Sequence, residues 1–140
     1  MTSIRFYSNA DDRLQAAADW IAGTWRERPV LVYAPDAAIA ERIDRILWMQ
    51  PATGFLPHCR GDSPLAAQTP VLIAGTLDTL PHDRCLVNLS HEVPPGFSRF
   101  EELIEIVSTD DADRLPARER FRFYRDRGYA VENCSAAGGH

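Results

Sequence analysis

The chain has 140 residues, of which 45% are hydrophobic and 25% are charged, and its net charge is −5 at pH 7. This composition fits one globular domain, and the negative charge argues against bulk electrostatic attraction to nucleic acid. No apolar run approaches the roughly 18 residues of a membrane span. The N-terminus lacks a signal-peptide pattern and the three cysteines lie far apart, so we expect a cytoplasmic protein without a disulfide framework.

The first half of the chain alternates strand-like and helical patterns. Residues 4–7 read as a short strand, and residues 8–12 supply turn and N-cap side chains. Apolar residues then recur at helical spacing, which predicts a first helix. Residues 30–34 are continuously apolar, which is typical of a strand buried on both faces. Asp36 then caps a second predicted helix, which ends near Trp48.

The second half continues this alternation after a longer connection. Residues 51–69 are predicted to be an extended loop, and the apolar runs at 71–74 and 85–89 are predicted to be strands. A helical turn is expected at 97–102, followed by a last core strand at 103–107. A charged helix is then expected to complete the fold.

Strands that alternate with helices predict an α/β fold, here a single three-layer domain with a mostly parallel sheet. The domain would span residues 1–135, with a disordered tail at 136–140. This architecture is Rossmann-like, but the turn at residues 8–12 has two acids and no glycine through which a phosphate could approach the backbone. The sequence has no Walker-type loop either. We therefore expect no nucleotide cofactor.

Three short patterns could suggest a metal site or a catalytic site. The His-Cys pairs at 58–59 and 82–85 lack the spacing of strong zinc sites, and buried cysteines with a loop histidine explain them better. The Ser-His-Glu run at 90–92 is consecutive, whereas the members of a catalytic triad converge from separate elements. We therefore expect no metal ligands and no catalytic residues.

The last helix carries a basic stripe and ends near Gly128, a residue type that favours the left-handed conformation at helix ends. After Ala117 the helix has five arginines and two acids, which gives this segment a net charge of +3. Arginines recur at i, i+4, i+8 and i+11, on one helical face: Arg114, Arg118, Arg122 and Arg125. With Phe121 beside them, they could bind an anionic ligand that has an apolar anchor. The alternative is a solvated face whose aromatic side chains all point inward.

Two longer motifs resemble a known family. Residues 42–48 read R-I-D-R-I-L-W and are followed by Pro51 and by F-L-P-H at 55–58; residues 117–129 read A-R-E-R-F-R-F-Y-R-D-R-G-Y. Together with Phe6-Tyr7, these motifs resemble the chi subunit of bacterial DNA polymerase III over nearly the whole chain. The resemblance implies a chi-type α/β fold and a non-catalytic accessory subunit of the clamp loader.

The resemblance also implies two surfaces for protein partners. One would bind the C-terminal tail of single-stranded DNA-binding protein, an aspartate run that ends in phenylalanine, so that contact with nucleic acid is indirect. By position, its residues here would be Arg114, Arg118, Phe121, Arg122 and Val107. Phe121 replaces a tyrosine that is common in the family, so a hydroxyl hydrogen bond would be lost at this position.

The second surface would bind the psi subunit of the clamp loader, or a helicase that competes for the same site. Its residues would be Trp48 and Phe55, near the end of the second helix. The alternative is that both aromatic side chains belong to the core. Pro116 leaves another point open: as a first-turn proline it would start the last helix near Leu115, so that Arg114 would precede the helix.

Two other functions compete with this interpretation. The arginine helix could bind nucleic acid directly, although one patch of about +3 would give weak and strongly salt-dependent affinity. The α/β fold could also belong to an enzyme with a degenerate nucleotide site, but no glycine loop supports that hypothesis.

Overall fold

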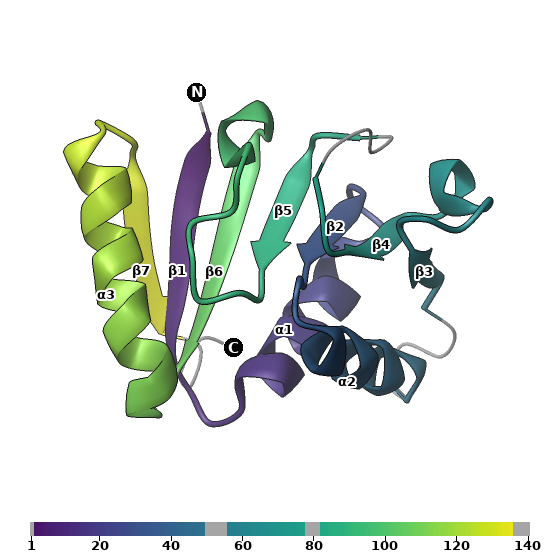
Figure 1. Cartoon of the computed structure of the whole chain (residues 1–140), viewed down its shortest axis with the longest axis horizontal. Coiled ribbons are helices and arrows are strands. Elements are labelled where there is room, and N and C mark those ends of the chain that lie inside the picture. The colour runs from purple at the N-terminus through teal and green to yellow at the C-terminus, as the bar shows by residue number, and fades with distance from the viewer. Residues whose placement is uncertain (1, 50–55, 78–81, 136–140) are drawn as a thin grey trace.

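A computed structural model describes residues 2–49, 56–77 and 82–135. Seven strands form one sheet in the order β3-β4-β2-β5-β6-β1-β7, and every pair of neighbouring strands is parallel (Figure 1). In chain order they are β1 (Ser3–Ala10), β2 (Val30–Tyr33), β3 (His58–Arg60), β4 (Val71–Ala74), β5 (Cys85–Asn88), β6 (Glu102–Ser108) and β7 (Val131–Ser135). The prediction of a mostly parallel sheet is confirmed.

Helices cover both faces of the sheet. The α-helices are α1 (Arg13–Thr24), α2 (Ala37–Trp48) and α3 (Asp111–Asp126), and the short 3₁₀ helices are η2 (Ala66–Gln68) and η3 (Phe97–Arg99). Each α-helix begins after an aspartate whose carboxylate accepts hydrogen bonds from N–H groups of the first turn: Asp12, Asp36 and Asp110. α1 and α2 pack on one face, and α3 packs on the other with the segment that connects β5 to β6. The predicted three-layer α/β domain is thus confirmed.

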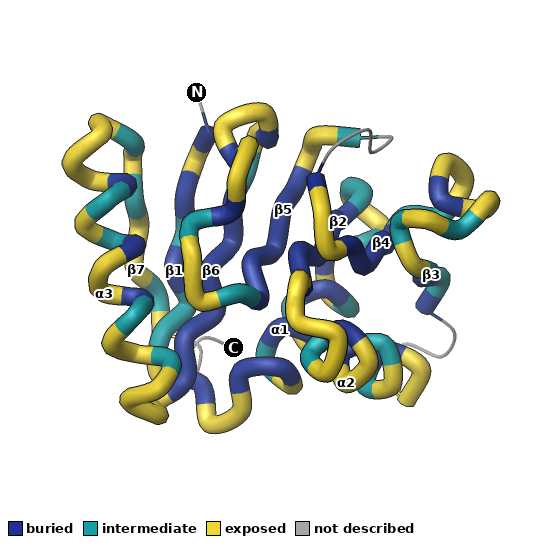
Figure 2. Tube along the Cα trace, in the orientation of Figure 1, coloured by how far each residue is buried: buried dark blue, intermediate teal, exposed yellow. Residues whose placement is uncertain are grey.

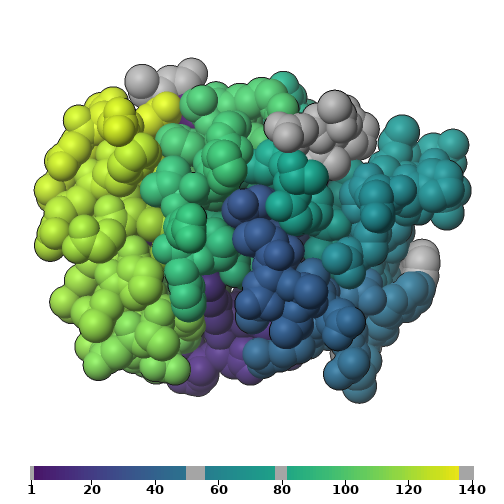
Figure 3. Space-filling model, in the orientation of Figure 1, coloured from purple at the N-terminus to yellow at the C-terminus, as the bar shows by residue number. Residues whose placement is uncertain are grey.

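The central strands are buried on both faces because each face is covered. The tube of Figure 2 is dark blue along β2 and β5, whereas yellow segments recur along the helices. All four residues of β2 are buried, as the continuous apolar run predicted. In Figure 3 the green atoms of the β5–β6 connection lie beside the yellow-green surface of α3.

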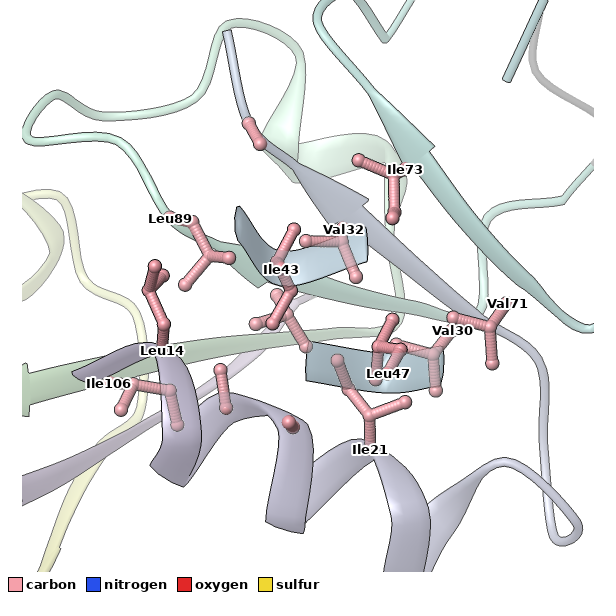
Figure 4. Packing of buried hydrophobic residues seen from close by; sticks show 14 of the residues in the cluster. Leu14, Ile21, Val30, Val32, Ile43, Leu47, Val71, Ile73, Leu89 and Ile106 are labelled. Carbon is pink, nitrogen blue, oxygen red and sulfur yellow. The ribbon is translucent and has the colours of Figure 1, made fainter. Parts of the chain in front are cut away.

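The core under α1 and α2 is aliphatic. Leu14 and Ile21 of α1 and Ile43 and Leu47 of α2 point toward valines and isoleucines of the sheet (Figure 4). All four side chains are at least 96% buried. Complete burial of a side chain of this size contributes about 1.5–3 kcal/mol, so these helical faces fix α1 and α2 on the sheet.

Three features differ from the predictions. The predicted loop at 51–69 contains β3 and η2 within its described part, and β7 follows α3 as an edge strand that was not predicted. α3 begins at Asp111, so Pro116 lies inside the helix rather than in its first turn, and Arg114 is helical. The missing N–H of Pro116 costs one helix hydrogen bond at the carbonyl of Ala112, an exposed residue whose carbonyl water can solvate.

Other predictions about chain ends and turns have different outcomes. Gly128 follows α3 with a φ of 87°, as expected for a glycine at a helix C-terminus. The predicted tail at 136–140 and the predicted contact residue Phe55 lie outside the described residues.

Candidate functional site

A pocket of about 350 Å³ lies between α3 and the sheet, where β1, β6 and β7 contribute its lining. Its floor is apolar: Phe6, Val107 and Ala117 are buried, and Phe121 is partly buried. The ring centroids of Phe6 and Phe121 are 5.3 Å apart, and the rings are tilted by 59°. An apolar side chain that entered this pocket would therefore meet aromatic and aliphatic surface.

Arginines of α3 form the helix side of the pocket: Arg114, Arg118, Arg122 and Arg125. Three of them pair with an acid on the same helix: Arg114 with Asp111, Arg122 with Glu119 at 3.2 Å, and Arg125 with Asp126 at 3.6 Å. Within the described residues, Arg118 has no carboxylate partner. Exposed pairs on one helix contribute only about 0.3–0.5 kcal/mol, so carboxylates of a ligand can replace them.

All five residues predicted for the tail-binding surface line this one pocket: Arg114, Arg118, Phe121, Arg122 and Val107. The structure thus brings together residues from α3 and the end of β6. Sequence reasoning missed the contributions of β1 and β7, which are Phe6, Ser8, Asn9 and Asn133. Arg125 was placed on the stripe by its spacing but was not predicted as a site residue.

A buried polar network lies between α3 and the sheet beside this pocket. Glu105 of β6 is completely buried and accepts hydrogen bonds from Arg120 at 3.1 Å, from the Tyr124 hydroxyl at 2.7 Å and from Asn88 at 3.0 Å. Burial, and then the charge of Glu105, raise the pKa of Tyr124 above its ordinary value, so this hydroxyl stays protonated and donates. The network fixes the rotation of α3 and hence the direction of its arginines.

Trp48 ends α2 at the other side of the sheet from α3 (Figure 1). Its residue surface is 58% exposed, and that of the adjacent Met49 is 71% exposed. Of the two alternatives for Trp48, the structure therefore supports an exposed side chain rather than a core position. Exposed large apolar neighbours of this kind are typical of a surface that contacts another protein.

The side chain of His58 packs against the Trp48 ring. The two rings meet edge to face with centroids 4.7 Å apart, and the His58 side chain is fully buried. His58 Nδ1 lies 2.9 Å from the Leu56 carbonyl oxygen, and Nε2 lies 3.0 Å from Asp44 Oδ1. The Asp44 contact is off the N–H direction and is thus an electrostatic contact rather than a linear hydrogen bond. His58 thereby ties the end of α2 to β3.

A larger pocket, of about 630 Å³, opens at the carboxyl edge of the sheet, where α/β proteins commonly bind ligands. Here the buried Arg13 side chain spans the strand ends and donates hydrogen bonds to four carbonyl oxygens, those of Asn88, Leu89, Ser90 and Ile106. The lining also includes six acids: Asp11, Asp12, Asp36, Glu92, Asp110 and Asp113. Three of these acids cap the N-termini of α1, α2 and α3, the positions at which a phosphate would otherwise bind.

The described helices include none that is long and apolar enough to span a membrane.

The family model described as DNA polymerase III chi subunit, HolC, matches residues 1–132. The chain is 30% identical over 138 residues to DNA polymerase III subunit chi of Pseudomonas aeruginosa, which covers 95% of this chain and 96% of that protein. It is 31% identical to the subunit chi of Haemophilus influenzae, over 82% of this chain and 81% of that protein. It is also 31% identical to the subunit chi of Escherichia coli, over 86% of this chain and 84% of that protein.

Proposed function

The chain belongs to the DNA polymerase III chi subunit family, and we propose that it links the clamp loader to single-stranded DNA-binding protein as a non-catalytic accessory subunit. One observation carries this proposal: four arginines of one helix stand beside a pocket with an apolar floor. This combination suits a peptide that has several carboxylates and an apolar end. The acidic tail of single-stranded DNA-binding protein, with its terminal phenylalanine, has this chemistry.

The arginine that would bind the tail first is Arg118. It has no carboxylate partner within the described residues, so a ligand carboxylate would not have to displace an existing ion pair. Arg122 lies one turn further along α3, and its pair with Glu119 is exposed on both sides. The terminal phenylalanine would enter between Phe121 and Val107, where burial of its ring removes apolar area from water.

We place the second partner, a psi subunit or a helicase, on the surface around Trp48 and Met49. Support comes from the exposure of both residues and from the position of α2, at whose end they lie, across the sheet from α3 (Figure 1). Because the two surfaces lie at different ends of the sheet, one molecule could bind both partners together. This arrangement is what a linking subunit requires.

A non-catalytic role is supported by the carboxyl edge of the sheet. Arg13 covers strand carbonyls there, and aspartates occupy the N-termini of the three α-helices. A phosphate group at this edge would meet acids rather than free N–H groups. Enzymes with this architecture bind nucleotides at the carboxyl edge of the sheet. In this chain the pocket at that edge is therefore an unfavourable place for a nucleotide.

Direct binding of nucleic acid by the arginines is the competing function, and one titration separates the two. The ligands are a labelled peptide that ends in an aspartate run and phenylalanine, and an unstructured single-stranded DNA. The proposal expects saturable peptide binding at physiological salt and much weaker DNA binding, because the chain as a whole is acidic. Tighter binding of the DNA than of the peptide would favour the competing function.

A further inference from the structure

The pocket between α3 and the sheet, from here on the tail pocket, has a strand side that is neutral and polar, unlike its arginine side. Ser8 and Asn9 of β1 and Asn133 of β7 form it. The Ser8 hydroxyl donates a hydrogen bond of 2.8 Å to Asn133 Oδ1. Within the described residues, the Asn133 amide nitrogen and both polar atoms of the Asn9 side chain have no hydrogen-bond partner. These groups are therefore available to a ligand in the pocket.

The backbone at Asn9 is unusual. Its φ is 65°, and no other non-glycine residue in the described part of the chain has a positive φ. The register of β1 against β6 also shifts between Tyr7 and Ala10, which marks a bulge with one extra residue in β1. Bulges commonly redirect a side chain beside a functional site, and asparagine tolerates the left-handed conformation better than most residues. The bulge thus places Asn9 at the pocket wall.

We propose that Asn9 and Asn133 hydrogen-bond the main chain of the acidic peptide next to its terminal residue; this inference rests on the proposed function of the pocket. A side-chain amide carries one carbonyl and one N–H₂ group, so it matches the donors and acceptors of a peptide unit. The arginines bind the peptide carboxylates on the helix side, and the apolar floor lies between. An extended peptide over this floor is then held by charge on one side and by neutral hydrogen bonds on the other.

The variant Asn9→Gly distinguishes a hydrogen-bonding role of the Asn9 amide from a purely conformational role of this residue. Asn9→Gly keeps a residue that adopts positive φ readily but removes the amide. Asn133→Ala removes the second amide, and Ser8→Ala serves as its matched control because it breaks the same Ser8–Asn133 hydrogen bond while the Asn133 amide remains. The probe is the synthetic peptide that ends in an aspartate run and phenylalanine, titrated at low and at high salt. Thermal melting of each variant checks that the fold is intact.

We expect Asn9→Gly and Asn133→Ala each to weaken peptide binding by about 3- to 10-fold, as for the loss of one neutral hydrogen bond. The loss should be the same at both salt concentrations, because no charge is removed, and the same for a peptide with an amidated C-terminus. Ser8→Ala, which breaks the Ser8–Asn133 hydrogen bond but keeps the Asn133 amide, should weaken binding less than Asn133→Ala does. Wild-type affinity in both asparagine variants would overturn the inference and leave Asn9 as a turn residue only.

Two other results would also overturn it. A loss that vanishes with the amidated peptide would assign the amides to the terminal carboxylate instead of the main chain. A wild-type protein that fails to bind the peptide even at low salt would overturn the proposed function itself, and the inference with it. Binding by wild type together with unaffected asparagine variants would overturn the inference alone.

Discussion

Arg120 of α3 and Glu105 of β6 form an ion pair that is buried on both sides, with side chains 3% and 0% exposed. Arg120 Nε lies 3.1 Å from Glu105 Oε2, and a terminal guanidinium nitrogen lies 3.1 Å from Oε1. The guanidinium thus donates a hydrogen bond to Oε2, whereas its contact with Oε1 is electrostatic, since Oε1 has no hydrogen-bond partner within the described residues. Arg118 and Arg122 flank Arg120 in the chain and point to the tail pocket. This pair therefore sets the orientation of the arginine surface.

Loss of one partner of this pair should be strongly destabilising. Arg120→Met leaves the Glu105 charge buried without its cation, and we expect the free energy of unfolding to fall by roughly 3–5 kcal/mol. Urea unfolding measures the change. Arg122→Ala, on the exposed face of the same helix, should change stability by no more than about 0.5 kcal/mol. Equal stability of Arg120→Met and wild type would mean that the pair does not hold α3.

The helix side of the site was predictable from the sequence, but the strand side was not. Spacing alone placed four arginines on one face, because helical periodicity holds wherever a helix forms. Asn9 and Asn133 come together only through the pairing of β1 with β7, which no local pattern specifies. β7 itself was missed because residues 131–135 have little apolar alternation, as befits an exposed edge strand. β3 was missed because three residues are too few to show a period.

Core elements were predicted better because each has a local cause. The aspartate caps of α1 and α2 and the apolar run of β2 each depend on a few neighbouring residues, so a local pattern predicts them. Pro116 left the start of α3 open, since a first-turn position is usual for proline, whereas in the structure it lies about one turn further into the helix. Tertiary packing of α3 on the sheet outweighs that local preference.

Arg118 should contribute most to tail binding. Arg118→Ala is expected to weaken peptide binding by roughly 1–3 kcal/mol, the usual cost of losing a charge-assisted hydrogen bond. Arg122→Ala should have a smaller effect within this range, because Arg122 gives up its pair with Glu119 when it binds the ligand. Arg60→Ala is the control, since Arg60 is an exposed arginine of the edge strand β3. Fluorescence anisotropy at low salt gives the three affinities, and wild-type binding by both α3 variants would refute the assignment.

Trp48 should act independently of the tail pocket. Trp48→Ala is expected to abolish association with a purified psi subunit or helicase while it leaves peptide affinity and the melting temperature nearly unchanged. Size-exclusion co-elution and the peptide titration measure the two activities. Leu65→Ala removes an equally exposed leucine elsewhere and should alter neither. A large drop in melting temperature without loss of association would instead give Trp48 a structural role.

Stability should fall in alkaline solution partly because of Cys85. Burial, and then the nearby charge of Glu102, raise the pKa of the Cys85 thiol from 9.0 to about 12. The folded state keeps this proton above pH 9 while the unfolded state releases it, so the stabilising contribution is complete below pH 9 and is lost as the pH rises toward 12. Urea unfolding between pH 8 and pH 10 should show a shallower decline for Cys85→Ala than for wild type. Identical slopes would contradict the shifted pKa.

The tail pocket is proposed to bind an acidic peptide through both charge and an apolar anchor. The salt concentration separates the charge contribution from the apolar contribution to binding. Charge attraction is screened over about 8 Å near physiological ionic strength, whereas burial of apolar area is not weakened by salt. Binding should therefore weaken with salt but persist. At high salt, removal of the terminal phenylalanine should damage binding more than neutralisation of one aspartate.

The decisive measurement is a titration of the full-length and the phenylalanine-deleted peptide at low and at high salt. We expect residual binding of the full-length peptide at high salt and none of the truncated one. Equal affinities of the two peptides, with nearly complete loss of both in salt, would contradict it and leave a simple electrostatic site without an apolar pocket around Val107 and Phe121.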